Sequence, residues 1–196
     1  MSNIWRYLNI DNHQPIGDEM YNFLSTQSDS LPPRPTNASY YFRLNVSHTL
    51  KNCPLLAKFL SGQQLNPLLI AIVICNHQNK VELHTDQPDG DDPYVRILWP
   101  VRNCQGSKTQ FWQVPKGSGK FMSDNNGVLF THFPPDYKRE LIDEFELIAP
   151  LVMDASVPHS ADPNPDLEGD RISLIIGFDR DLPISKSIKA WFGFQR

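Results

Sequence analysis

The chain has 196 residues, of which 40% are apolar and 20% are charged. This length and composition are typical of a globular domain with a sizeable core, and we expect residues 1–196 to form a single domain. The formal net charge of −4 provides no basic stripe, which argues against nucleic acid as a partner.

No apolar run is long enough to cross a bilayer, since the longest, residues 67–75, has the length of a strand. The first residues lack the basic start and apolar core of a signal peptide. Cys53, Cys75 and Cys104 have no CxxC spacing, which argues against a disulfide framework and against a structural zinc site. We therefore expect a soluble, cytoplasmic protein that does not bind membranes.

Seventeen prolines and many short β-branched or aromatic runs predict a mainly β protein with long loops. A helix is expected over residues 16–24 and a second over residues 52–60, with Asn52 as its cap, Pro54 in its first turn and Gly62 as its stop. Nine strands are expected, at residues 39–46, 68–75, 80–84, 94–101, 109–114, 127–130, 142–148, 151–155 and 171–178.

Several of these strands are apolar on both faces, as in residues 70–74, which predicts strands enclosed between layers. Two packed sheets, or a jelly roll, with a few flanking helices would satisfy this pattern. Three polar segments, residues 27–37, 115–126 and 160–170, are expected to be loops. The glycines at 117 and 119 would allow the second loop to move, which leaves a role as a lid open.

One imidazole and one carboxylate follow each other at the end of the strand in VELHTDQPDGDD. His84 and Asp86 are two positions apart, so on extended backbone their side chains project to the same side. His159 lies where a later apolar strand runs into a turn, and the last apolar strand opens with Arg171 and Ser173, which also share a face.

Each of these short motifs has an ordinary alternative reading. His84 and Asp86 could belong to a solvated strand end, and Arg171 could form a surface ion pair with Glu168 or Asp170. The order along the chain is what favours a shared site: H-x-D, then about seventy residues later a second histidine, then R-x-S opening the final strand.

This order resembles the Fe(II)- and 2-oxoglutarate-dependent oxygenases, a family whose double-stranded β-helix carries H-x-D...H iron ligands and a later R-x-S for the cosubstrate. The matching residues are His84-Thr85-Asp86, His159 and Arg171-Ile172-Ser173, and the resemblance covers about residues 81–178. It implies a cupin-like double-stranded β-helix core over residues 67–180, supported by strands and helices from residues 1–66.

The resemblance also implies roles for these residues. His84, Asp86 and His159 would be the catalytic iron ligands, a facial triad that leaves three coordination positions for 2-oxoglutarate and O2. Arg171 would pair with the far carboxylate of 2-oxoglutarate, and Ser173 would donate one further hydrogen bond to it. The implied reaction is hydroxylation of an amino acid, a peptide side chain or a small metabolite, with release of succinate and CO2.

Two other functions remain open from the sequence. The chain could be a cupin-like metalloenzyme that does not use 2-oxoglutarate, or a non-catalytic jelly-roll module that binds carbohydrate or a protein partner. Other polar residues near the pattern are also of interest. His132 could touch substrate, Tyr94 and Arg96 could reach inward if their strand has the right parity, and Asp89, Asp91 and Asp92 are expected to form a solvated acidic turn.

Overall fold

The computed structural model describes residues 4–27, 39–76, 80–86, 95–123 and 129–178. These residues form three helices and two six-stranded sheets, and every strand pair is antiparallel. The helices are α1 (Gln14–Thr26), α2 (Val46–Asn52) and α3 (Pro54–Gly62).

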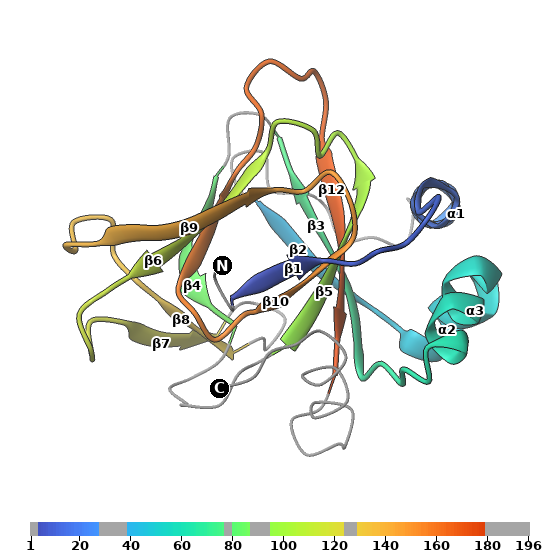
Figure 1. Ribbon diagram of the computed structural model, residues 1–196, viewed down its shortest axis with the longest axis horizontal. Helices are drawn as coiled ribbons and strands as arrows, with labels where there is room; N and C mark the ends of the chain where they lie inside the picture. Colours follow the sequence, from blue (N-terminus) through green and yellow to red (C-terminus); the bar gives the residue numbers. More distant parts are fainter. Residues whose placement is uncertain (1–3, 28–38, 77–79, 87–94, 124–128, 179–196) are drawn as a thin grey trace.

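The first sheet has the order β1 (Trp5–Tyr7), β10 (Leu151–Asp154), β5 (Val95–Arg102), β12 (Arg171–Gly177), β3 (Leu69–Cys75) and β2 (Tyr40–Leu44). The second sheet has the order β7 (Lys120–Ser123), β8 (Leu129–His132), β4 (Val81–Thr85), β11 (His159–Asp162), β6 (Lys108–Gln113) and β9 (Glu140–Glu146). Figure 1 shows the helices on one side of the first sheet and the second sheet on the other side.

The two faces of the first sheet pack against different layers. Ile172, Leu174 and Ile176 of β12 belong to the core that the sheet forms with the helices. Leu98 of β5 belongs to a second core, which also contains residues of β6 and β9 and therefore lies between the sheets. This three-layer arrangement explains why strands such as β3 are apolar on both faces.

Trp99 anchors the helical layer. It is fully buried, its ring lies edge-on to Phe59 of α3 at 5.0 Å, and its Nε1 donates to the His13 carbonyl just before α1 at 3.3 Å. On α1 the buried residues Ile16, Met20 and Leu24 recur every fourth position, which places them on one helical face against this core. The helices therefore cover the first sheet on the face away from the second sheet.

The prediction of a mainly β protein with two packed sheets is confirmed, and each of the nine expected strands has a counterpart among the described residues. Three short strands were not predicted, namely β1, β7 and β11. β7 lies inside the segment 115–126 and β11 overlaps the start of the segment 160–170, so the expectation of loops there is wrong for residues 120–123 and 160–162. β11 (HSAD) is polar, and its pairing with β4 and β6 fixes it as a strand instead of its own propensity.

The expected cap of the second helix is also wrong. Two helices meet at this point, and Asn45 caps the first of them by accepting from the His48 backbone N–H. Asn52 instead ends α2, where its side chain donates to the His48 carbonyl, while Pro54 opens α3 as expected. The sequence pattern did not predict α2.

Two further expectations can be compared with the structure. Cys53, Cys75 and Cys104 are buried free thiols. Within the described ranges, no helix combines the length and the apolar character that crossing a bilayer requires. The expected acidic turn at residues 89–92, most of the expected loop at 27–37, and Tyr94 lie outside the described residues.

Candidate metal centre

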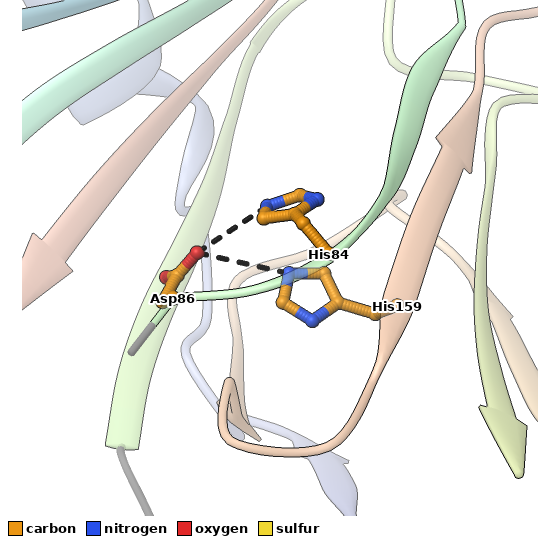
Figure 2. A group of neighbouring side chains, drawn as sticks. All are labelled: His84, Asp86 and His159. Atoms are coloured by element: carbon orange, nitrogen blue, oxygen red, sulfur yellow. Dashed lines mark ion pairs between the residues drawn. The ribbon is translucent and has the colours of Figure 1, made fainter. Parts of the chain in front are cut away.

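Three side chains from two strands of the second sheet converge at one point (Figure 2). His84 lies on β4, Asp86 directly follows that strand, and His159 is the first residue of β11. One ligand atom from each lies within 4.8 Å of the others. The predicted convergence of His84, Asp86 and His159 is therefore present in the structure.

Strand pairing accounts for this geometry. His84 and His159 are directly opposite each other across the antiparallel pair β4–β11, and their ring centroids are 4.5 Å apart. Asp86 Oδ1 lies 3.4 Å from Nε2 of His84 and 4.0 Å from Nε2 of His159. The Asp86 backbone N–H donates to the Ala155 carbonyl at 3.0 Å, which fixes the chain just beyond the end of β4.

Backbone carbonyls orient both imidazoles. His84 Nδ1 lies 2.7 Å from the Glu82 carbonyl, and His159 Nδ1 lies 2.8 Å from the Val157 carbonyl. Because a carbonyl only accepts, each Nδ1 must carry the proton, and the Nε2 lone pair of each neutral ring then points toward Asp86. This is the tautomer that a metal-binding histidine requires.

Burial and charge shift the three groups in different directions. Burial and the neighbouring His84 lower the pKa of His159 to about 4. Burial also lowers the pKa of His84, but the hydrogen bond and charge of Asp86, with help from Glu82, outweigh it and leave that pKa raised. Burial acts to raise the pKa of Asp86. The pKa nevertheless falls well below its ordinary value because His84, Arg96 and His159 favour the carboxylate. The centre is thus a carboxylate with two imidazoles of unequal basicity.

Arg96 is a neighbour of this centre that the sequence left undecided. It lies on β5 of the first sheet, is only 4% exposed, and its Nε donates to Asp86 Oδ2 at 3.3 Å. The parity of β5 therefore does turn Arg96 inward. Strand alternation indicated that every second residue of this strand faces the same side, but the sequence did not show whether Arg96 is on the inward or the outward side.

Arg171 and Ser173 lie together on β12, as predicted, and both are buried. They alternate with Ile172 and Leu174, which face the helices, so Arg171 and Ser173 face the second sheet. Arg171 Nη1 lies 3.4 Å from Ser173 Oγ and 4.0 Å from Cys75 Sγ.

No carboxylate among the described residues pairs with Arg171, and its buried Nε has no hydrogen-bond partner. The alternative reading of Arg171 as a surface ion pair with Glu168 or Asp170 is therefore wrong. A buried guanidinium with an unused donor is suited to an anionic ligand.

Aromatic and polar side chains surround the two imidazoles. Phe130 lies edge-on to His84 at 6.4 Å, and the fully buried Phe111 lies 6.1 Å from His159. His132 is directly opposite His84 in the β4–β8 pair, and its Nε2 lies 2.8 Å from Glu82 Oε2. This places His132 on the same face of the second sheet as the candidate ligands.

No protein-family model matches the sequence, and no curated protein sequence matches it either. Solved structures do match. The non-haem α-ketoglutarate-dependent carbocyclase SnoK from nogalamycin biosynthesis aligns with a TM-score of 0.52 at 10% identity, over 93% of this chain and 86% of that chain. HygX from Streptomyces hygroscopicus, crystallised with nickel and 2-oxoglutarate, aligns with a TM-score of 0.50 at 12% identity, over 88% of this chain and 80% of that one.

The fold is a double-stranded β-helix. Its neighbours among solved structures include the α-ketoglutarate-dependent SnoK and HygX with bound 2-oxoglutarate, and this likeness confirms the fold expected from the sequence pattern. The His-Asp-His group of this chain lies on strands of that fold. At these identities the likeness concerns the fold alone.

Proposed function

We propose that this chain is an Fe(II)- and 2-oxoglutarate-dependent oxygenase that hydroxylates an amino acid, a peptide side chain or a small metabolite. The observation that carries the proposal is the convergence of His84, Asp86 and His159 within 4.8 Å, with both imidazoles oriented by backbone carbonyls. SnoK, which has the same fold, is a carbocyclase, so the fold does not by itself indicate hydroxylation.

The donor set fits divalent iron. Two neutral imidazoles and one carboxylate are the ligands of non-haem Fe(II) oxygenases, and they leave three positions of an octahedral ion open. A tetrahedral structural zinc site would require a fourth protein ligand, and the described residues supply three. We assign His84, Asp86 and His159 as the ligands that would hold the iron.

Arg171 and Ser173 fit 2-oxoglutarate. The far carboxylate of this cosubstrate needs a cation and hydrogen-bond donors in a dry site, and Arg171 offers a buried guanidinium whose Nε is unused. The Ser173 hydroxyl is within 3.4 Å of the same guanidinium, so both groups can donate to one carboxylate. HygX, crystallised with 2-oxoglutarate, supports this choice of cosubstrate.

When bound, iron and 2-oxoglutarate would supply the oxidation: one atom of O2 enters succinate, formed with loss of CO2, and the other enters the substrate as a hydroxyl group. The protein provides position and protonation. Backbone carbonyls hold the protons of His84 and His159 on Nδ1, so both Nε2 lone pairs stay available. Phe111 and Phe130 flank the imidazoles with apolar rings.

The test is an anaerobic titration of the protein with Fe(II) and 2-oxoglutarate. We expect one iron per chain and the weak visible charge-transfer band of the chelate. His159→Ala and Asp86→Ala should each lose the band and weaken metal binding by more than about tenfold, because one of only three protein ligands is removed. His48→Ala, which removes an exposed histidine on α2, is the matched control and should behave like the unaltered protein.

The alternatives predict different results. A cupin-like metalloenzyme without 2-oxoglutarate would bind iron through the same three residues but show no charge-transfer band and no 2-oxoglutarate-dependent succinate. A non-catalytic binding module would bind no stoichiometric iron. Once the chelate is established, a panel of amino acids, peptides and small metabolites that raises succinate formation above the uncoupled rate would identify the substrate class.

A further inference from the structure

We propose that Arg96 is a positioning residue that holds Asp86 as a one-oxygen metal ligand. This inference rests on the metal centre of the proposed function, but it concerns a residue outside the H-x-D...H and R-x-S patterns. Arg96 reaches the centre from β5 of the first sheet, whereas His84 and His159 lie on strands of the second sheet and Asp86 directly follows one of them.

The two oxygens of Asp86 have different surroundings. Oδ1 faces the imidazoles, at 3.4 Å from His84 Nε2 and 4.0 Å from His159 Nε2. Oδ2 accepts a hydrogen bond from Arg96 Nε at 3.3 Å. Only Oδ1 is therefore directed toward the point that both Nε2 atoms share.

Packing confines the guanidinium of Arg96. The residue is 4% exposed and lies directly opposite Gly177 in the β5–β12 pair. A Cβ at Gly177 would come within 2.3 Å of Arg96 Nη1 and 2.9 Å of its Cζ, so the guanidinium occupies the space that a side chain at 177 would fill. Gly177 is not among the glycines with positive φ, so this glycine provides space and not an unusual backbone conformation.

This arrangement has a consequence for coordination. A carboxylate with both oxygens free can bind an ion through both and so take two of the six positions of an octahedral ion. Together with two imidazoles, it would then leave two positions instead of three. A two-pronged 2-oxo acid alone would fill both, so Arg96 would preserve the third position by engaging Oδ2.

Cobalt(II) is a suitable probe because its visible bands respond to the number and arrangement of its ligands, and no turnover is needed. We would record the spectrum of the Co(II)-loaded chain for the unaltered protein, Arg96→Met, Arg96→Lys and Gly177→Ala. Gly177→Ala keeps the arginine but displaces its guanidinium. The matched control is Arg102→Met, which removes an exposed cation from the same strand, where it stacks on Tyr21 at 4.4 Å.

We expect Arg96→Met and Gly177→Ala to share one altered spectrum, while Arg102→Met keeps the original one. Arg96→Lys should restore the original bands only in part, since an ammonium lacks the fixed fork of the guanidinium. Melting curves of the metal-free variants separate this effect from unfolding, and if Arg96→Met does not fold, Arg96→Lys and Gly177→Ala carry the comparison.

An unchanged spectrum in folded Arg96→Met, or in Gly177→Ala if Arg96→Met does not fold, would overturn the inference and leave the proposed function intact. Failure of the metal centre would look different. If the unaltered chain binds no Co(II), or if the His159→Ala variant binds Co(II) as tightly as the unaltered chain does, the assignment of the metal centre is wrong and both proposals fail.

Discussion

Arg171 carries a buried charge for which the described residues supply no counterion. A buried, unpaired charge destabilises a fold, and an apolar side chain of similar size is often neutral or stabilising in its place. Replacing an arginine that has a structural role would instead destabilise the fold, because it would break an ion pair. This burial supports the proposed role of Arg171 in binding 2-oxoglutarate.

Arg171→Met should weaken 2-oxoglutarate binding by about 10- to 100-fold, since a charge-assisted hydrogen bond contributes about 1.5–3 kcal/mol. The same variant should bind Fe(II) or Co(II) as before and melt at the same temperature or higher. Calorimetric titration and melting curves measure both effects. Arg139→Met, which removes an exposed arginine that stacks on Trp112, is the control. A large loss of stability in Arg171→Met with normal 2-oxoglutarate binding would contradict the assignment.

The two imidazoles also predict how metal binding depends on pH. An ion and a proton compete for the same Nε2 atom, so each ligand that is protonated in the metal-free protein reduces affinity as the pH falls. The pKa of His84 is raised, whereas the pKa of His159 is lowered to about 4 and that of Asp86 lies well below its ordinary value. Between about pH 4.5 and 6, only His84 should therefore be protonated in the metal-free protein.

Co(II) affinity should accordingly fall about tenfold for each unit by which the pH is lowered in this range, which corresponds to one displaced proton. Titrations at several pH values give the number of protons directly from the slope. A slope that corresponds to two displaced protons would mean that His84 and His159 are protonated over the same pH range. That result would contradict the unequal basicity of the two imidazoles.

At the scale of the elements, one helix is capped by a side chain from another. The residue before α3, Cys53, makes no side-chain capping bond, yet Glu19 of α1 accepts from the backbone N–H groups of Leu55 at 2.9 Å and Leu56 at 3.0 Å. The carboxylate satisfies donors that a helix start leaves unpaired and complements its dipole. This contact joins the two helices that cover the first sheet.

Glu19→Ala should cost about 1 kcal/mol of the free energy of unfolding, as the loss of a cap typically does. For a chain of this length that lowers the melting temperature by about 2–4 °C. Asp18→Ala changes the charge equally at the neighbouring exposed position and should stay within about 0.5 kcal/mol of the unaltered protein. Equal effects of the two variants would show that charge, and not capping, is responsible.

At the scale of the whole molecule, the first sheet separates two hydrophobic cores. One core joins it to the helices, and the other joins it to the second sheet, which carries the candidate metal ligands. Leu174 is fully buried in the first of these cores, on the face of β12 away from Ser173. Damage to the helical layer should therefore lower stability without directly altering the ligand geometry.

Leu174→Ala should lower the free energy of unfolding by about 2–5 kcal/mol because it leaves a cavity in a closed core. The part of the protein that remains folded should still bind Co(II) with unaltered spectrum. Leu68→Ala, at a position that is 57% exposed, is the control and should have little effect on denaturant unfolding. A changed cobalt spectrum in folded Leu174→Ala would show that the two cores are not independent.

Local sequence predicted most strands because apolar and β-branched runs report burial directly, as residues 70–74 do. It missed β11, HSAD, because this strand is polar and short and is held by β4 and β6 on either side. It also placed His159 at the end of a strand, whereas His159 begins one. The local pattern does not show whether residues 159–162 form a strand or where that strand begins, because both depend on pairing with strands that are distant in the chain.

The sequence by itself determined the layered, mainly β architecture, because apolar runs report burial locally, and side-chain alternation placed His84 and Asp86 on one side of the chain. The addition of His159 came from the order H-x-D...H along the chain, which resembles the oxygenase family. Only the tertiary structure decided that His84 and His159 face each other across two strands, that Arg171 is buried with no acidic partner in the described part of the chain, and that Arg96 donates to the second oxygen of Asp86. These facts depend on register and on which faces of two sheets meet, and no short stretch of sequence contains either.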